Sequence, residues 1–196
     1  KTKLGNPEAR ARVENTCVTQ LTNFLNSKKN EYIGQLIIEK AKGSWVTDEH
    51  GKRFLDGMAG LWCVNVGYGR EELAKAAYEQ LKELAYFPLT QSHSPAIKLA
   101  EKLNEMLGEE YVIFFSNSGS EANEVAFKIA RQYHQQKGEH SRYKFISRYR
   151  SYHGNSMGAL AATGQAQRKY KYEPLAPGFI HVAPPDQYRN RESEKI

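Results

Sequence analysis

The stretch from residue 111 to residue 133 constrains the fold of this 196-residue chain more than any other part of its sequence. A short apolar run, 111–115, is followed by a turn of small residues. Apolar residues then recur at helical spacing, at Ala122, Val125, Ala126, Ile129, Ala130 and Tyr133. The apolar run predicts a buried strand, and the later spacing predicts a helix over about 121–136. The sequence therefore predicts a strand, a turn and a helix in succession.

The turn between this strand and this helix has the composition of an anion-binding site. The first N–H groups of a helix have no partner within the helix, and the helix dipole is positive there. Ser118 and Ser120 add hydroxyl donors, and Gly119 allows a ligand to approach the backbone. A phosphate group is the expected ligand. Ser118 followed by Glu121 is also a capping box, which many helices carry without binding anything, so both interpretations fit the residues.

The rest of the chain predicts an α/β fold. Residues 35–56 predict a small antiparallel unit of strands with a turn at 48–51. Further elements are predicted in the chain order helix 70–84, helix 94–107, strand 144–147, helix 156–162 and strand 179–182. Strands separated by helices imply a parallel sheet, with ligands bound at the carboxyl ends of its strands. The turns at 117–121 and 149–156 both follow such strands.

The second of these turns, 149–156, offers an aromatic surface. Tyr152 could lie flat against a planar ligand, and Gly154 allows a close approach. A surface loop with a solvated Tyr152–His153 pair is the alternative interpretation. The sequence contains no G-x-x-x-x-G-K-[ST], no G-x-G-x-x-G after a strand and no G-x-S-x-G. These absences argue against nucleotide-binding P-loops, dinucleotide folds and a serine nucleophile elbow. A cofactor with one phosphate and one flat ring remains.

The net charge of +6 raises the question of nucleic-acid binding. Basic residues and tyrosines alternate over 142–172 and superficially resemble a stacking platform. The same alternation suits a solvated surface, and no recognised nucleic-acid-binding motif is present. We expect an anionic small molecule and no nucleic acid.

Metal and membrane functions have little support in the sequence. Cys17 and Cys63 have no metal-ligand spacing and form no disulfide framework, and we expect Cys63 to be buried. The six histidines form no metal-binding cluster, so no metal is expected. No apolar run is long enough to span a membrane, and the first residues have no signal-peptide core. We therefore expect a cytoplasmic protein with no membrane partner.

Four segments in this order carry a resemblance to a known family: residues 54–69, 86–93, 115–123 and 152–154. Over about 43–188 the chain resembles the N-terminal part of the class III (ω-amino acid) aminotransferases, which use pyridoxal 5′-phosphate (PLP). Within that family it looks most like the ω-amine:pyruvate and taurine:pyruvate aminotransferases. The resemblance implies an incomplete fold type I large domain, like that of aspartate aminotransferase. A parallel-rich sheet over 66–196 would follow an N-terminal segment, 1–65, that holds the small antiparallel unit.

The resemblance also implies roles for particular residues. Ser118, Gly119 and Ser120 would hold the phosphate of the cofactor, and Tyr152 would stack on its pyridine ring. Trp62 would form a wall of the substrate pocket. The loop at 86–93 would help to shape a site built between the two subunits of a homodimer. The implied reaction moves an amino group from an ω-amine or a taurine-like donor to pyruvate, with PLP acting as electron sink.

Two departures from the family pattern bear on activity. The lysine that bonds covalently to PLP has no counterpart here, because lysines such as Lys128 and Lys144 follow no such motif. No catalytic residue is therefore assigned, and we expect the chain alone to be an inactive part of a longer enzyme. Residues 1–34 do not follow the usual N-terminal segment of the family. A non-catalytic remnant, a dimerising interaction module and a nucleic-acid binder remain as alternatives.

Overall fold

The structure, a computed structural model, describes residues 36–88, 90–186 and 188. Its internal contacts divide the chain between His93 and Ser94 into two units, and each unit is described by itself. Expectations about residues 1–34 lie outside the described residues. The domain boundary predicted between residues 65 and 66 stays a prediction.

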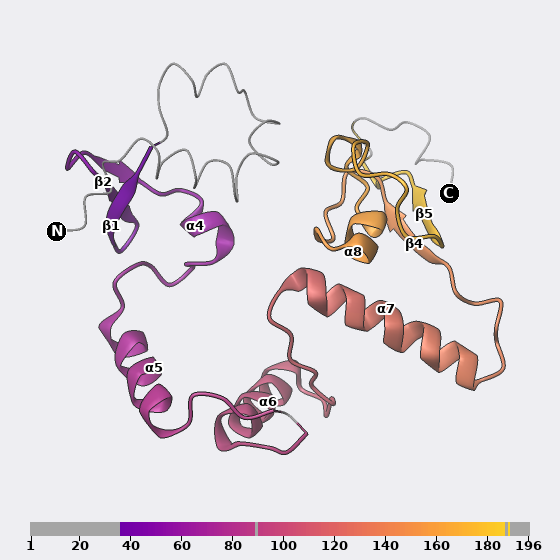
Figure 1. The fold of residues 1–196 in the computed structure, drawn as a ribbon, viewed down its shortest axis with the longest axis horizontal. Coiled ribbons are helices and arrows are strands. Elements are labelled where there is room, and N and C mark those ends of the chain that lie inside the picture. The colour runs from indigo at the N-terminus through magenta and orange to yellow at the C-terminus, as the bar shows by residue number, and fades with distance from the viewer. Residues whose placement is uncertain (1–35, 89, 187, 189–196) are drawn as a thin grey trace. The chain divides into compact units, whose positions relative to one another are not determined.

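The first unit contains the predicted antiparallel sheet. Strands β1 (Ile38–Lys42), β2 (Trp45–Asp48) and β3 (Arg53–Leu55) pair in the order β1-β2-β3 (Figure 1). The first strand begins three residues later than the predicted start at residue 35. The turn between β2 and β3 is closed by the Asp48 side chain, whose Oδ1 accepts hydrogen bonds from the backbone N–H groups of His50 at 2.9 Å and Lys52 at 2.8 Å.

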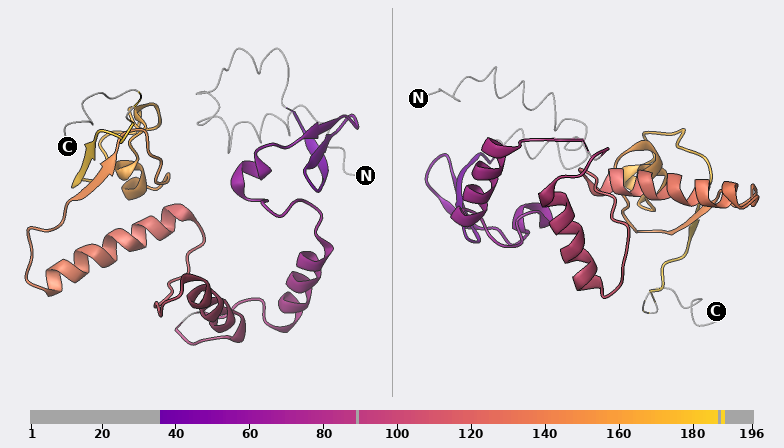
Figure 2. Two further views of the ribbon diagram at one scale, coloured as in Figure 1. Left: turned by 180° about the vertical axis from the view of Figure 1, so that it is seen from behind. Right: turned by 90° about the horizontal axis from the view of Figure 1, so that it is seen from below.

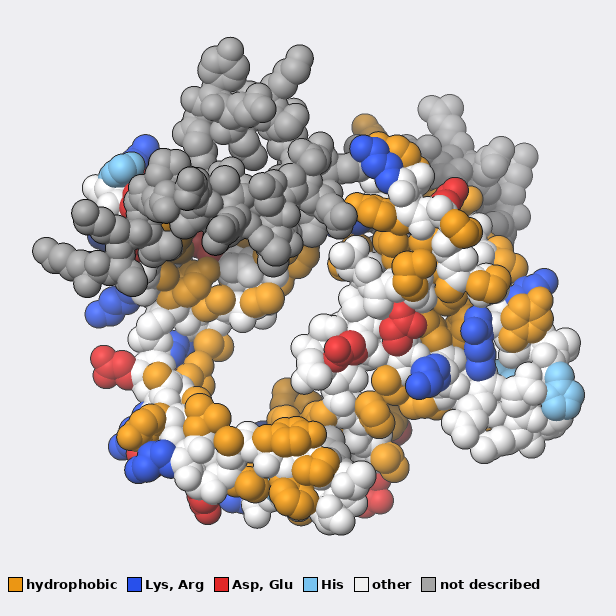
Figure 3. All heavy atoms as spheres, in the orientation of Figure 1, with side chains coloured by type: hydrophobic (Ala, Val, Ile, Leu, Met, Phe, Trp, Pro, Cys, Tyr) orange, Lys and Arg blue, Asp and Glu red, His pale blue; other side chains and the backbone are white. Residues whose placement is uncertain are grey.

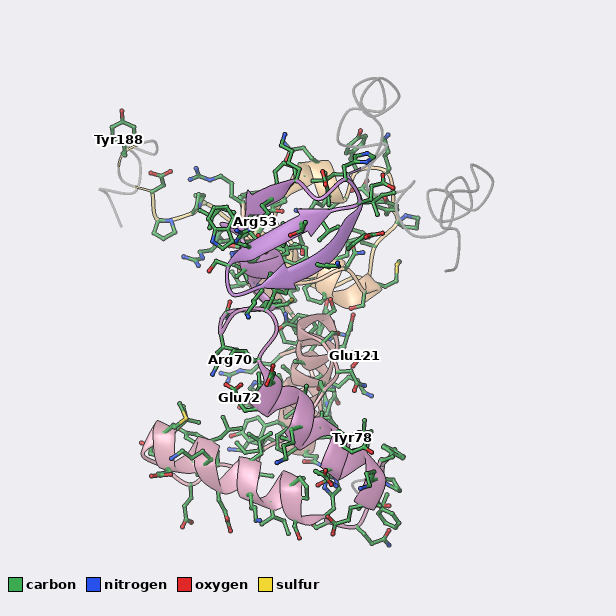
Figure 4. The ribbon with its side chains drawn as sticks, turned by 90° about the vertical axis from the view of Figure 1, so that its left-hand side faces the viewer. Arg53, Arg70, Glu72, Tyr78, Glu121 and Tyr188 are labelled. Atoms are coloured by element: carbon green, nitrogen blue, oxygen red, sulfur yellow. The ribbon has the colours of Figure 1, made fainter. Side chains whose placement is uncertain are left out.

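A short helical turn and a longer helix follow the sheet in this unit. The segment after β3 contains one helical turn, α4 (Ala59–Trp62), and then leads to α5 (Glu71–Glu83). Figure 4 shows Arg70 and Glu72 side by side at the start of α5, where they form an ion pair. Cys63, predicted to be buried, is exposed. That prediction was wrong because its apolar neighbours belong to a loop and not to a core element.

The second unit begins with α6 (Ser94–Leu107), which ends at Gly108 as predicted. Gly108 has φ +76°, the left-handed conformation in which glycine commonly ends a helix. Large apolar side chains of α6 are exposed, among them Ile97, Met106 and Leu107. The same is true of α5 in the first unit, and Figure 3 shows hydrophobic side chains on the surface of both helices.

The predicted parallel unit lies further along the second unit. The elements are α7 (Gly119–Gln136), β4 (Phe145–Arg148), α8 (Met157–Ala162), a 3₁₀ turn (Ala166–Arg168) and β5 (Phe179–Val182). Strands β4 and β5 pair in parallel, with α8 in the connection between them packed on both strands (Figure 2). This arrangement confirms the predicted strand–helix–strand crossover.

Two clusters hold this unit together. The ring of Phe127 on α7 lies 4.8 Å from that of Phe145 on β4 and 5.1 Å from that of Phe179 on β5, measured between centroids. The α8 residues 159–162 are at most 4% exposed and form the core. Because small alanine side chains fill α8, the strands can approach its backbone closely. The rings join the middle of α7 to the first residues of β4 and β5, and α8 packs on α7 and on both strands.

The strand predicted at 111–115 is not formed. Residues 110–116 have no regular secondary structure, and no described strand pairs with them. The backbone of Tyr111 instead bonds the Asn104 side chain, through Asn104 Nδ2 to Tyr111 O at 3.1 Å and Tyr111 N to Asn104 Oδ1 at 3.2 Å. Val112 is fully exposed and Phe114 is 69% exposed. An apolar sequence favours a strand, but a strand also needs a neighbour for its hydrogen bonds.

No helix among the described residues is both long enough and apolar enough to cross a membrane. Within the same residues, no group of three or more His, Cys, Asp or Glu side chains is placed to hold a metal ion.

Candidate cofactor site

The turn at 117–121 starts α7 as the capping-box pattern predicts. Ser118 is the N-cap in an extended conformation, and its Oγ accepts a hydrogen bond from Glu121 N at 3.2 Å. Glu121 Oε2 in turn accepts from Asn117 N at 2.9 Å, one residue earlier than in the standard box. Figure 4 labels Glu121 beside the start of this helix. The cap therefore exists, and it uses one lone pair of Ser118 while leaving the hydroxyl proton available to a ligand.

The same turn fits a phosphate group. The backbone N–H groups of Gly119 and Ser120 are the first two of α7, and no partner for them occurs among the described residues. A Cβ placed on Gly119 would meet no atom within 4 Å, so the space in front of the turn is open. The turn therefore combines free N–H donors, two hydroxyl groups and the positive end of a helix of 18 residues.

Side chains from the first turns of α7 bind this helix to the second predicted turn. Ser120 Oγ accepts a hydrogen bond from Asn155 N at 3.0 Å, and Asn123 Nδ2 donates to the carbonyl oxygen of His153 at 2.6 Å. The two turns that the sequence places at carboxyl ends of strands are thus in direct contact. Asn123 was not singled out from the sequence, although it lies one helical turn after Ser120 on the same face.

Glu124 makes the densest contact between these segments. Its Oε1 accepts hydrogen bonds from Ser156 Oγ at 2.6 Å, Gly158 N at 2.8 Å and Ala159 N at 3.0 Å. The carboxylate therefore caps the start of α8 from another helix. Burial raises the pKa of Glu124, but hydrogen bonds from Ser156, Ala159 and Gly158 outweigh it and hold the pKa below its ordinary value.

The absence of a side chain at Gly154 allows α7 to pack against this segment, which differs from the role that the sequence predicted for this glycine. A Cβ there would lie 2.6 Å from Ser120 Oγ and 2.7 Å from the Cβ of Ala159, and the residue has φ +135°. The sequence suggested that Gly154 makes room for a ligand. The structure shows that it makes room for Ser120 of the same chain.

Tyr152 directly precedes the residues that contact α7 and is 51% exposed. The guanidinium of Arg168 lies over its ring, 5.0 Å from the centroid. Arg168 Nε also donates to Gln165 Oε1 at 2.6 Å, which fixes the guanidinium. Arg168 lies in the stretch 142–172 in which basic residues and tyrosines alternate, and no local sequence pattern links it to Tyr152.

A hollow of about 400 Å³ lies near the turn, lined by Phe114, Phe115, Ser116, Asn117, Glu121, Glu124, Val125 and Lys128. None of the four predicted cofactor residues lines it, and two carboxylates do. The two carboxylates outnumber the single lysine, Lys128, and disfavour a phosphate, so we do not assign the cofactor to this hollow.

Trp62, the predicted substrate-pocket residue, lies on α4 in the first unit and is 73% exposed. The turn at 117–121 and Tyr152 belong to the second unit. The loop at 86–93 is irregular where described, and residue 89 is outside the described residues.

Comparison with known proteins decides which family uses this arrangement. The model of the family "Aminotransferase class-III" matches residues 26–196, most of the chain. The chain belongs to the class III aminotransferases. The match begins well before residue 43, so the extent expected from the motifs was too short. Residues 26–34, expected to depart from the family pattern, lie within it.

Individual relatives agree with this assignment. An uncharacterized aminotransferase, YhxA, of Bacillus subtilis is 79% identical over 155 residues, which cover 79% of this chain and 34% of the relative. The taurine–pyruvate aminotransferase of Bilophila wadsworthia is 44% identical over 156 residues, covering 79% and 34%. The putrescine–pyruvate aminotransferase of Pseudomonas aeruginosa is 37% identical over 171 residues, covering 86% and 38%. The class III chain thus spans about a third of the length of these curated relatives.

Solved structures confirm the fold class. An aminotransferase of Bacillus anthracis has a TM-score of 0.78 and 63% identity, over 91% of this chain and 42% of that one. An amine transaminase from an uncultivated Pseudomonas species, solved in its PLP-bound form, has a TM-score of 0.77 and 37% identity, over 84% and 38%. The described part of this class III aminotransferase is a partial α/β piece with a small antiparallel sheet and a parallel pair. Its family cofactor is pyridoxal 5′-phosphate.

Proposed function

We propose that this chain supplies the phosphate-binding and ring-stacking part of the PLP site in an aminotransferase that uses pyruvate as amino acceptor. The complete enzyme would take the amino group from an ω-amine or a taurine-like donor. The donor would become a carbonyl compound, and pyruvate would become alanine. When bound, PLP supplies the electron sink for this exchange.

The start of α7 carries this proposal. Gly119 and Ser120 would donate backbone N–H groups to the phosphate, and Ser118 and Ser120 would donate hydroxyl protons. Each hydroxyl oxygen already accepts one backbone hydrogen bond, from Glu121 N and Asn155 N respectively, and this contact orients the hydroxyl group. Preorganised donors of this kind stabilise an anion without further ordering cost.

Tyr152 would lie against the pyridine ring. Its partial exposure supports this role, since the ring has surface free for a ligand, and the contact with Arg168 limits its movement. The hydrogen bonds between α7 and residues 153–159 fix the backbone next to Tyr152 relative to the phosphate turn. Trp62 would form a wall of the donor pocket.

The donor class follows from the relatives. The taurine–pyruvate and putrescine–pyruvate aminotransferases share pyruvate and differ in the amine that their names give. We propose pyruvate as acceptor on this basis, and a terminal amine as donor. We also propose that the complete enzyme is cytoplasmic and a homodimer. The homodimer is proposed because the 86–93 segment resembles a family segment that reaches the subunit interface.

We further propose that the 196-residue chain alone does not complete the reaction, because no lysine in it matches the family's PLP-binding lysine. Mixing the isolated chain with PLP, taurine and pyruvate should yield no alanine above background. Substantial alanine formation would contradict this part of the proposal.

The complete gene product tests the main proposal. It should bind PLP and form alanine from pyruvate with taurine or putrescine as donor. Ser120→Ala and Tyr152→Ala should each weaken PLP binding about tenfold, a loss of roughly 1.4 kcal/mol. Ser116→Ala, outside the cap, and Tyr152→Phe, which keeps the ring, should bind PLP normally. Equal PLP affinity in all four variants would refute these cofactor assignments.

The nucleic-acid alternative finds less support. Arg150 pairs with Asp186 at 2.8 Å, and Lys169 Nζ lies 3.4 Å from His181 Nε2 in a partly buried position. Several cations of the 142–172 region thus contact groups of their own chain. A salt-dependent mobility shift with DNA or RNA that PLP does not abolish would favour that alternative.

A further inference from the structure

The segment 56–68, which carries Trp62, is a loop with joined ends. Asp56 N donates to Ser44 O at 2.9 Å, and Tyr68 exchanges two backbone hydrogen bonds with Gly43, at 2.8 and 2.9 Å. Tyr68 Oη then donates to Asp56 Oδ2 at 2.8 Å, which joins one end of the loop to the other. A compact loop closed in this way is a typical carrier of functional residues.

Inside the loop the backbone turns in the left-handed direction. Four successive residues have positive φ: Ala59 at 48°, Gly60 at 58°, Leu61 at 59° and Trp62 at 67°. Left-handed helical backbone costs roughly 1–2 kcal/mol for each residue with a Cβ, and it persists only where surrounding contacts hold it. Trp62 is the last residue of this turn, so the direction of its side chain depends on the turn.

The Asp56 carboxylate holds the left-handed turn. Its Oδ1 accepts from Met58 N at 3.0 Å, and its Oδ2 accepts from Gly60 N at 2.7 Å in addition to Tyr68 Oη. Each oxygen accepts from one backbone N–H, of Met58 or of Gly60, and a backbone N–H can only donate. An amide in place of the carboxylate would turn an NH₂ group toward one of these donors.

At Gly60 the left-handed turn packs against the side chains of Tyr68 and Val64. A Cβ on Gly60 would lie 2.8 Å from Tyr68 Oη and 2.9 Å from Val64 Cγ2. The turn is therefore packed directly against the residue that bonds Asp56. A change at Asp56 or Tyr68 would release both the hydrogen bonds and this packing.

We propose that Asp56 is a positioning residue that, through the left-handed turn, sets the orientation of Trp62 and thereby the size of amine donor that the pocket accepts. This inference rests on the proposed role of Trp62 as pocket wall. Asp56 itself would not touch the donor.

The chain provides a matched control. Asp48 also closes a turn with its carboxylate, but both of its backbone donors, His50 N and Lys52 N, bond the same atom, Oδ1. Asp48→Asn can keep both contacts through its amide oxygen, whereas Asp56→Asn must lose at least one. The two substitutions make the same chemical change in the same unit.

The experiment compares kcat/KM for a small donor, taurine, with that for a bulky donor, 1-phenylethylamine, in the complete gene product. Asp56→Asn should change the ratio of the two values about tenfold, since a difference of one methylene group in an apolar pocket changes discrimination by roughly tenfold or more. PLP affinity should change less than twofold. Asp48→Asn should leave the ratio unchanged, and Tyr68→Phe, which keeps both backbone contacts of Asp56, should shift it in the same direction by a smaller factor.

A Trp62→Ala background separates the possible failures. There, Asp56→Asn should have no further effect on the ratio, because its effect passes through Trp62. If Trp62→Ala changes the ratio and neither Asp56→Asn nor Tyr68→Phe does, the inference is wrong and the proposed function stands. An equal effect of Asp56→Asn with and without Trp62 also overturns it. If Trp62→Ala leaves the ratio unchanged, both the pocket-wall role of Trp62 and the inference are wrong. If the complete gene product does not bind PLP, the proposed function is refuted.

Discussion

The loop at 56–68 and the junction between α7 and residues 152–159 are stabilised by hydrogen bonds that span different distances along the chain. Each presents residues of the candidate site, and each is held by a carboxylate that accepts three hydrogen bonds. Asp56 finds its donors 2, 4 and 12 residues away. Glu124 finds its donors 32 to 35 residues away. The Asp56 contacts therefore lie within the loop itself, whereas the Glu124 contacts join segments that only the tertiary fold brings together.

This difference predicts how each region responds to damage. A change in the junction should reduce the stability of the second unit, because the contacts between α7 and α8 depend on it. A change in the loop should alter Trp62 with less effect on global stability.

The junction is broken most strongly by Gly154→Ala. The new Cβ would clash with Ser120 and Ala159, and the φ of +135° is unfavourable for alanine. We expect a loss of about 3 kcal/mol from overpacking and backbone strain together. Urea unfolding of the complete gene product measures it. The control Gly138→Ala, with φ +74° and no atom within 4 Å, carries strain alone and should cost about 1 kcal/mol.

Removing the carboxylate is the next largest change. Glu124→Ala leaves Ser156 Oγ and the N–H groups of Gly158 and Ala159 without their acceptor, and should cost about 2 kcal/mol. Glu105→Ala, which breaks an exposed pair with Lys102, should cost no more than about 0.5 kcal/mol. Comparable losses in the two variants would show that the junction is not held by Glu124.

A smaller effect is expected at the start of α7. Ser118→Ala removes the acceptor for Glu121 N and should cost about 1 kcal/mol, the usual value for an N-cap. Thermal unfolding of the complete gene product, compared with Ser116→Ala, measures this. An unchanged Tm for Ser118→Ala would mean that water or Glu121 replaces the cap.

The dependence of stability on acid pH compares the carboxylates of Asp56 and Glu124 directly. The hydrogen bond from Tyr68, followed by those from Gly60 and Met58, holds the pKa of Asp56 below its ordinary value. A depressed pKa of the folded state means that the contribution is complete above the ordinary value, about 3.9, and is lost as the pH falls through the lower folded value. The pKa of Glu124 is also lowered, so its contribution follows the same direction from about 4.3 downward.

Acid titration of the unfolding free energy checks this expectation. The free energy of unfolding should fall as the pH decreases below about 4.3. Asp56→Asn and Glu124→Gln should each remove part of this loss of stability. Parallel curves for the wild type and both variants would contradict the assignment of these two groups.

The sequence determined the elements whose signals are local. The hairpin strands follow residue alternation and turn residues at 48–51, and α7 follows its cap at Ser118 and its apolar spacing. The four motifs indicated the family that the comparisons confirmed, together with its cofactor. Ser118, Gly119, Ser120 and Tyr152 follow from the residues of their turns as well as from the motifs, whereas Trp62 follows from the motifs alone. The roles of all five remain proposals.

The tertiary structure decided what depends on distant partners. The apolar run at 111–115 reads as a strand, but no described strand supplies its hydrogen bonds, so it stays irregular. Gly154 reads as space for a ligand, but the fold brings Ser120 into that space. Glu124 and Arg168 carry no local signal at all. Spacing along a chain encodes contacts within a turn or a helix, whereas contacts over 30 residues arise only when packing brings the segments together.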